Sequence, residues 1–283
     1  MQNIIETEKA STQSLQINWQ NLVIVSSFHV LAVVALFYFS WANLAVMLIF
    51  NWLVASLGIG IGYHRLLTHR SFKVSKWLEY GLTILGSLAI QDGAIKWVTT
   101  HRIHHAYTEE EQDPHSTRES FTWAHVGWVL LGRAQEHDLT TCARYVPDLM
   151  KDKFHVIFSR YYYVSTIILG VLLFAVGGWS MVFWGIFLRT VIGWHSTWIV
   201  NSVTHFWGTR RFMTQDDSTN NGLVAFFSFG EGWHNNHHAH PTSARHGLTW
   251  YEFDQNWLTI RLFQKLGWAK QVKIHNLPDK ETN

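Results

Sequence analysis

The chain has 283 residues and a formal net charge of +2, which is too small to indicate binding to nucleic acid. Hydrophobic residues make up 48% of it and charged residues only 15%, against about 25% in an average soluble protein, so the composition indicates a membrane protein. The single cysteine, Cys142, excludes an intramolecular disulfide and a thiolate-rich metal site.

The N-terminal part of the chain predicts a polar tail followed by two membrane-spanning helices. Residues 1–20 are polar and lack the cationic start and the small-residue cleavage site of a secretory signal. Residues 21–63 contain no Asp, Glu, Lys or Arg, and this length accommodates two spans of about 20 residues each. Because the break in the stretch falls near residues 40–43, which include Ser40 and Asn43, we expect spans at residues 22–39 and 44–62.

The middle of the chain, residues 63–162, carries mixed charge and predicts a water-facing cap. The apolar residues 77–90 are too few to cross a bilayer, so we expect an interfacial or re-entrant helix there. The acidic residues 109–111 and the Asp113-Pro114 pair predict a solvated loop, and short helices are expected at residues 125–153.

A second apolar pair predicts spans at residues 163–179 and 181–200, divided by Gly177-Gly178. Arg189 is the one formal charge in these spans, and it either serves a function or reaches an interface. Both hairpin turns are short and uncharged, so the charged segments share one side, which the positive-inside rule assigns to the cytoplasm. We therefore expect an all-α integral membrane protein with one domain at residues 21–283, four transmembrane helices, cytoplasmic termini, and a cytoplasmic cap formed by residues 63–162 and 201–283.

Eight histidines fall into three short sequence words. Residues 64–69 have the pattern H-x(4)-H, and residues 101–105 and 234–238 both have the pattern H-x-x-H-H. Chance clustering is the alternative, but repetition of the same five-residue word makes it a poor one. In the first word the five-residue step is about 140° around an ideal helix, so its histidines converge only if the helix ends or bends there.

The H-x-x-H-H spacing suits two nearby metal ions. His101 and His105 share a helix face, whereas His104 points about 100° away from His105 and can serve a second ion. In the word at residues 234–238 the outer histidines can serve the second ion and His237 the first. The pattern predicts a dinuclear, all-histidine metal site.

Imidazole ligands suit iron, copper, zinc and nickel, so the ligand type alone leaves the metal open. A redox-active metal pair beside a bilayer indicates oxidation of an acyl chain by activated oxygen, because side-chain acids and bases cannot attack unactivated C–H bonds.

The three words, in this order, resemble the histidine boxes of the membrane fatty-acid desaturases, which hold a diiron centre. The resemblance covers about residues 20–275 and is to the delta-9 branch, in particular to cyanobacterial and other bacterial enzymes without a fused cytochrome b5 domain. Besides the boxes, the segments that carry it are residues 62–65, 68–72, 113–115, 125–128, 201–205 and 230–235, together with Trp97.

The resemblance implies two iron ions (Fe²⁺) and a ninth ligand, His205. One iron would be held by His64, His69, His101, His105 and His237. The other would be held by His104, His205, His234 and His238, with Asn201 reaching it through a water molecule.

The resemblance also implies the reaction, which is O2-dependent delta-9 desaturation of a fatty acyl chain with an external electron donor, expected to be a ferredoxin. Animal acyl-CoA enzymes of this branch have Arg-Asp just before the second box, where this chain has Thr99 and Thr100. This difference favours an acyl chain on a glycerolipid over acyl-CoA and leaves an acyl-carrier protein open.

By resemblance, the bend of the substrate tunnel is formed by Gln91, Trp97 and Thr197. The blind end of the tunnel would lie at Trp52 and Ser56, which are four residues apart and share a helix face. The alternative for Trp52 is a side chain that faces lipid.

Two other functions stay open from the sequence. Related histidine-box enzymes hydroxylate or ketolate lipids, and a non-enzymatic haem or metal-binding protein could use His29 and His195 as haem ligands. We expect structural or supporting roles for the remaining histidines, which are His115, His125, His137, His155, His240, His246 and His275.

Overall fold

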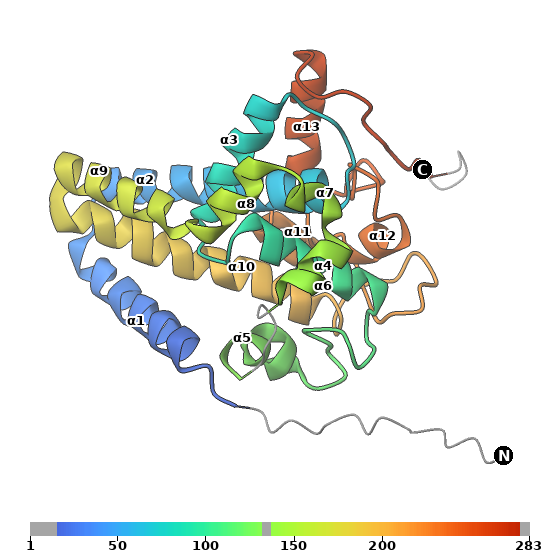
Figure 1. Ribbon diagram of the computed structural model, residues 1–283, viewed down its shortest axis with the longest axis horizontal. Coiled ribbons are helices and arrows are strands. Elements are labelled where there is room, and N and C mark those ends of the chain that lie inside the picture. Colours follow the sequence, from blue (N-terminus) through green and yellow to red (C-terminus); the bar gives the residue numbers. More distant parts are fainter. Residues whose placement is uncertain (1–15, 132–136, 278–283) are drawn as a thin grey trace.

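The computed structural model describes residues 16–131 and 137–277, and within these ranges every regular element is a helix (Figure 1). The expected tail at residues 1–20 lies largely outside the described residues. The elements are α1 (Trp19–Ala35), η1 (Leu36–Tyr38), α2 (Trp41–Asn51), η2 (Trp52–Thr68), α3 (Lys76–Ser87), α4 (Ala94–Ala106), η3 (Trp123–Gly127), α5 (Trp128–Leu130), α6 (Leu139–Tyr145), α7 (Pro147–Met150), α8 (Lys153–Arg160), α9 (Tyr163–Val182), η4 (Phe183–Leu188), α10 (Arg189–Val203), α11 (Gly222–Phe227), α12 (His234–Ala239) and α13 (Gln255–Lys265).

Three continuous helical runs in the described residues are long and apolar enough to cross a membrane. They are Trp19–Tyr38, Trp41–Thr68 and Tyr163–Val203, with 20, 28 and 41 residues. Large apolar side chains on their outer surfaces are exposed, as at Val30 and Ile167. A helix that is apolar around its whole circumference is stable in lipid, where these side chains need no protein partner.

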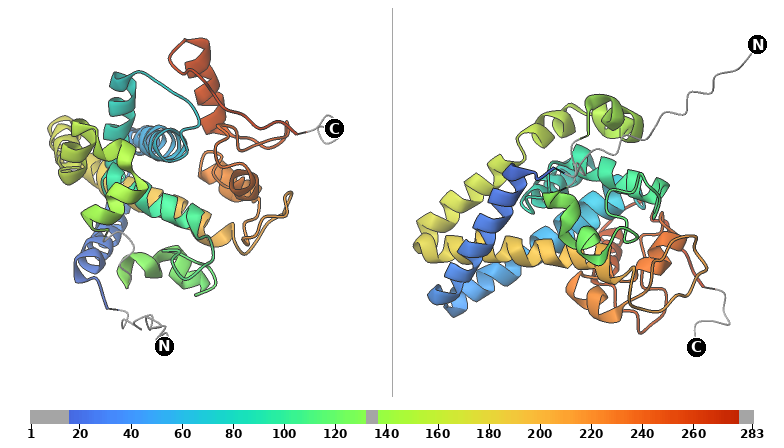
Figure 2. Two further views of the ribbon diagram at one scale, coloured as in Figure 1. Left: turned by 45° about the vertical axis from the view of Figure 1, so that its right-hand side comes forward. Right: turned by 90° about the horizontal axis from the view of Figure 1, so that it is seen from below.

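The longest of these runs folds back on itself at Gly177 and Gly178. Gly178 has a φ of +64°, a conformation that glycine adopts without the steric cost of a Cβ atom. Figure 1 shows α9 running out to this turn and α10 returning beside it. The long helices gather at one end of the molecule and the short helices at the other, as Figure 2 also shows.

The second long run continues past the predicted end of its span and carries the first histidine word. Its distal part, η2, is a π-helix, in which the backbone N–H bonds the carbonyl five residues earlier. The amide of His69 accordingly donates to the carbonyl of His64 at 3.1 Å. The wider helix therefore places His64 and His69 one above the other, where an ideal α-helix would have separated them.

Close packing of α3 against η2 depends on glycine. A Cβ atom on Gly58 would lie 2.5 Å from the backbone nitrogen of Gly86, so the two helices touch through their backbones. Buried Ile61, Leu82 and Val98 fill the adjoining core between η2, α3 and α4.

The structure corrects the prediction for the loop after α4 and decides between the two alternatives for Arg189. Glu109 and Asp113 are only 4% and 6% exposed, so the loop after α4 is not uniformly solvated, although Glu110 and Glu111 are exposed. Arg189 is 1% exposed and does not reach an interface, because its guanidinium donates to the carbonyls of Gly185 and Leu88.

Candidate metal centre and acyl cavity

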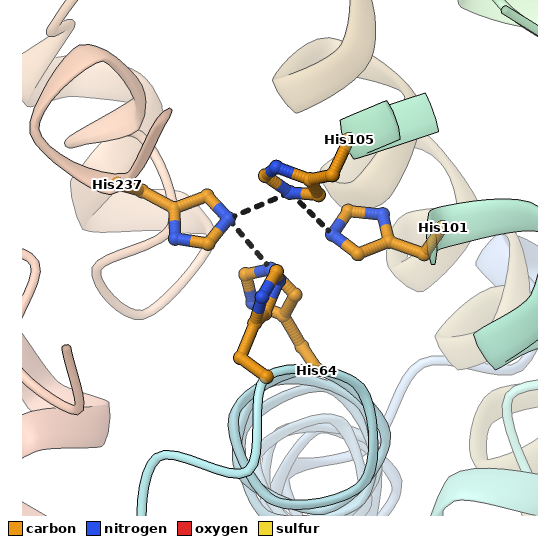
Figure 3. Close-up of side chains that lie close together, drawn as sticks. His64, His101, His105 and His237 are labelled. Carbon is orange, nitrogen blue, oxygen red and sulfur yellow. Dashed lines mark hydrogen bonds between the residues drawn. The ribbon is translucent and has the colours of Figure 1, made fainter. Parts of the chain in front are cut away.

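Nine histidines of the described chain converge in two adjoining groups. The five-histidine group contains His64, His69, His101, His105 and His237. Figure 3 shows four of its rings meeting from η2, α4 and α12. The facing Nε2 atoms lie 3.1 Å apart for His64 and His237, and 3.0 Å apart for His105 and His237.

The four-histidine group contains His104, His205, His234 and His238. His205 reaches it from the turn after α10, and its Nε2 atom lies 3.0 Å from that of His234. The rings of His105 and His238, one from each group, have centroids 4.6 Å apart, so the groups are immediate neighbours. The structure thus brings together all nine histidines, in the same two sets that the resemblance implies.

Four buried or half-buried carboxylates lie against Nδ1 atoms of these histidines, and three of them, Asp113, Glu109 and Asp216, accept a hydrogen bond there. The Nδ1–carboxylate distances are 2.7 Å for His64–Glu231, 2.9 Å for His104–Asp113, 2.7 Å for His205–Glu109 and 2.9 Å for His238–Asp216. Such contacts fix the ring orientation and keep the proton on Nδ1, which leaves Nε2 free to bind a metal. The sequence analysis did not assign these four residues to the site. Three of them, Glu109, Asp113 and Glu231, lie close in sequence to a histidine word or to His115, and this proximity was the only signal for their role that the sequence offered.

The protonation pattern fits bound cations. When Nδ1 of His205 donates to Glu109, the Nε2 atom of His205 carries no proton in the neutral ring, yet it faces the Nε2 atom of His234. The Nε2 atoms of His69 and His238 are buried without a hydrogen-bond partner among the described residues. A metal ion within each group would satisfy these nitrogens, so the donor set suits two metal ions.

The pKa values of the grouped histidines favour the neutral, metal-binding form. Burial, followed by the neighbouring imidazoles, holds the pKa of His101 and His104 well below its usual value. Burial likewise lowers the pKa of His105 to about 3. Glu231 remains ionised, because Arg65 and the rings of His64 and His246 hold its pKa well below the usual range against the opposing effect of burial.

Arginine side chains position the histidine words. Arg65 is fully buried, and its Nη2 atom donates to Glu231 at 2.8 Å and to Asp254 at 3.0 Å. Arg102, within the second word, donates to the carbonyls of Leu67 and Thr68, at the end of η2. These contacts join the first word to the second and third.

An elongated, mostly apolar cavity of about 150 Å³ reaches the histidines, and we call it the acyl cavity. Its walls include His64, His101, His234, Ile59, Trp128 and Val200. The three predicted bend residues all line it. Gln91 donates to Thr197 at 3.0 Å and accepts from the indole N–H of Trp97 at 3.2 Å. Trp97 also stacks on His101, so the bend lies beside the five-histidine group. Asn201, four residues before His205, lines the same cavity.

The structure does not place the predicted blind end, Trp52 and Ser56, at the acyl cavity. Neither residue lines the acyl cavity, to which η2 contributes Ala55 and Ile59 instead. Ser56 points away and donates to the side-chain oxygen of Asn256 at 2.6 Å. The spacing indicates which residues share a face of η2 but not what that face packs against, and Ser56 faces α13, which carries Asn256.

The remaining histidines lie around the centre or away from it. The ring of His115 packs on that of His104, and that of His246 packs on that of His237, with centroids 4.3 and 4.4 Å apart. The Nε2 atoms of His29 and His195 are 3.1 Å apart, in direct contact, which leaves no space for a haem between them. The other histidine contacts are His125 with His195, His137 with Thr100, His155 with Glu79, and His240 with His275.

Comparisons with known proteins agree with this arrangement. The family model described as fatty acid desaturase matches residues 39–269. The chain is 46% identical to the sn-2 palmitoyl-lipid 9-desaturase of Nostoc sp., over 92% of this chain and 91% of the relative. It is 42% identical to the sn-1 stearoyl-lipid 9-desaturase of Synechocystis sp., over 90% of this chain and 80% of the relative. Identity to the acyl-CoA C20 delta5-desaturase of Anemone leveillei is 39%, over 90% of this chain and 81% of the relative. The chain belongs to the fatty acid desaturase family.

Proposed function

We propose that this protein introduces a cis double bond at the delta-9 position of a saturated fatty acyl chain esterified to a glycerolipid, using O2. The observation that carries the proposal is the acyl cavity, which is lined by Gln91 and Thr197 and by histidines of both groups. The relatives named as lipid 9-desaturases support the position of the double bond.

The metal in each group is iron in this proposal. The five-histidine group would hold one ion, and the four-histidine group, with Asn201 through a water molecule, would hold the other. When bound, such a pair supplies the oxygen chemistry needed to remove two hydrogens from unactivated carbons. The histidines are ligands, and no further side chain is proposed as an acid or base.

The protein itself orients the substrate. The hydrogen bonds from Trp97 to Gln91 and from Gln91 to Thr197 hold the bend rigid, so two neighbouring carbons of a bound chain are presented to the centre. The apolar walls formed by Ile59, Trp128 and their neighbours exclude water from the reacting carbons.

A glycerolipid is the proposed acyl carrier. Thr99, at one of the positions where acyl-CoA enzymes have Arg-Asp, is fully buried and donates to the carbonyl of Ile95, so its side chain offers no cation to a CoA head. The relatives named as lipid desaturases are also more similar than the named acyl-CoA enzyme. The electron donor is proposed to be a separate ferredoxin.

The proposed topology has four membrane spans, with the cap and both termini in the cytoplasm. The turn at Gly177 and Gly178 supports it, because it divides the 41-residue run into two antiparallel arms, each near the length of one crossing.

Expression in a desaturase-deficient host, with fatty acids analysed separately in glycerolipids and acyl-CoA, tests the proposal. We expect cis-delta-9 monounsaturated chains to arise first in a glycerolipid class. Hydroxylated or ketolated chains would instead indicate the alternative histidine-box chemistry. Early appearance in acyl-CoA would contradict the proposed carrier.

A further inference from the structure

A second, smaller cavity lies directly beyond the bend of the acyl cavity. Its volume is about 10 Å³, roughly the size that holds one water molecule. It shares four wall residues with the acyl cavity, namely Ala55, Ile59, Gln91 and Thr197. The smaller cavity, here called the end cavity, therefore adjoins the acyl cavity at Gln91 and Thr197.

The end cavity has mainly apolar walls, but three polar side chains with unsatisfied atoms also line it, which is unusual for the end of a tunnel for hydrocarbon. Asn51, Arg189 and Thr190 all line it, and the last two are each 1% exposed. The Oδ1 atom of Asn51, the Nη2 atom of Arg189 and the Oγ1 atom of Thr190 are buried without hydrogen-bond partners among the described residues. Buried polar atoms in proteins are nearly always hydrogen-bonded to protein or to ordered water. Three such atoms around one cavity of this size suit a bound water molecule.

Removing the water molecule from this cluster would cost free energy, because the cluster includes the buried cation of Arg189. Two of its donors bond the carbonyls of Gly185 and Leu88, and no carboxylate among the described residues pairs with it. A methyl group that advanced into the cavity would displace the partner of a buried cation without replacing its hydrogen bond, which is unfavourable.

The distance from the bend suits a ruler for chain length. Thr197 and Arg189 lie on the same helix, eight residues apart, which is about 12 Å along its axis. That distance is comparable with the part of a palmitoyl or stearoyl chain beyond its ninth carbon, and relatives are named for these two chains.

We propose that the hydrated polar cluster of Asn51, Arg189 and Thr190 is the end-stop that sets the acyl chain length. This inference rests on the proposed function, because it takes the occupant of the acyl cavity to be an acyl chain. In this proposal the end of the tunnel is formed mainly by α10, and not by Trp52 and Ser56 as the sequence predicted.

Gly193 offers the sharpest test, because it lines the end cavity and has space in front of it. A Cβ atom there would meet only Oδ1 of Asn51, at 3.9 Å, so a larger side chain grows into the cavity without a backbone clash. Gly170 is the matched control. It lies in α9, a Cβ atom on it would meet nothing within 4 Å, and it lines neither cavity.

The experiment expresses wild type, Gly193→Leu, Gly193→Ala, Arg189→Met and Gly170→Leu in a desaturase-deficient host supplied with palmitic, stearic and arachidic acids. The readout is the ratio of monounsaturated products of different length within each strain, which does not depend on protein abundance. Gly193→Leu should shift the ratio toward the palmitoyl product, which is two methylenes shorter than the stearoyl product, by about tenfold. Gly193→Ala should shift the ratio less, in the same direction. Arg189→Met should raise the share of arachidoyl product, and Gly170→Leu should match wild type.

An active wild type with the same ratios in Gly193→Ala, Arg189→Met and Gly170→Leu would overturn the end-stop and leave the proposed function intact. A shift in Gly170→Leu equal to that in Gly193→Leu would also overturn it. Absence of delta-9 product from wild type with all three acids would instead reject the proposed function on which the inference rests.

Discussion

The Nδ1 atom of His64 and a carboxylate oxygen of Glu231 lie 2.7 Å apart, which ties the first histidine word to the segment just before the third. The other oxygen of Glu231 accepts from the buried guanidinium of Arg65, the next residue along η2. One carboxylate therefore contacts the ring of His64 and also holds the helix that carries it.

Replacing this carboxylate should weaken metal binding without removing a ligand. We expect Glu231→Gln to lower iron affinity by about 10- to 100-fold, because the amide removes the negative charge that lies against His64 and pairs with Arg65. Iron retained per chain after titration with a chelator is the measurement. The control is Glu110→Gln, which changes an exposed carboxylate in the loop after α4 and should retain iron as wild type does.

Arg102 should support the metal centre only by holding η2 and α4 in position, without contacting metal or substrate. Its guanidinium holds the last carbonyls of η2, the carbonyl of Tyr145 and the carboxylate of Asp148. Arg102→Met removes these charge-assisted bonds, so we expect a loss of stability on the order of 2 kcal/mol and lower iron content. Melting in detergent measures the first effect. Arg144→Met, at an exposed neighbour, should melt with wild type, and equal melting of both variants would contradict the role of Arg102.

Stability should depend on the ionisation of Asp148. Burial opposes its ionisation, but Arg102 and Arg70 prevail and hold the pKa of Asp148 at about 2. Because the folded value lies below the ordinary one of 3.8, its contribution is complete above about pH 4 and is lost as the pH falls toward 2. Asp148→Asn should therefore lower the melting temperature at about pH 6, by a margin that narrows at about pH 3. A margin independent of pH would contradict this assignment.

Replacing Asn201 should reduce activity less than replacing one of the histidine ligands. We expect Asn201→Ala to lose about 10- to 100-fold in activity yet keep detectable product, since its proposed contact runs through a water molecule. His205→Ala, which removes a direct ligand, should yield none. Equal loss of product in both variants would show that Asn201 binds the metal directly.

Trp52→Ala should leave the chain-length profile unchanged, because Trp52 lines neither the acyl cavity nor the end cavity. If this variant desaturated longer acyl chains than wild type does, the blind end of the tunnel would lie at η2, as the sequence predicted.

The sequence was sufficient for the parts of the site that follow from short-range spacing. The H-x-x-H-H words lie on helices whose 3.6-residue repeat separates His104 from His101 and His105, and the structure places these rings in different groups. His205 followed only from family resemblance, because a single histidine at a helix end has no distinguishing spacing. The supporting role of Glu109 was missed because an acidic run suggests solvent, and only tertiary structure shows that one of its members is buried against His205. The surroundings of Ser56 could not be predicted, since its spacing does not reveal that it packs against Asn256, 200 residues further along the chain.

The central claim is that two irons, held by the nine histidines, carry out delta-9 desaturation. Iron content and products should be measured together for the purified wild type, His104→Ala, His237→Ala and the control His275→Ala. We predict two iron ions per wild-type chain with cis-delta-9 product, less iron and no product in either ligand variant, and wild-type behaviour in His275→Ala. Full activity in His104→Ala or His237→Ala would contradict the diiron assignment.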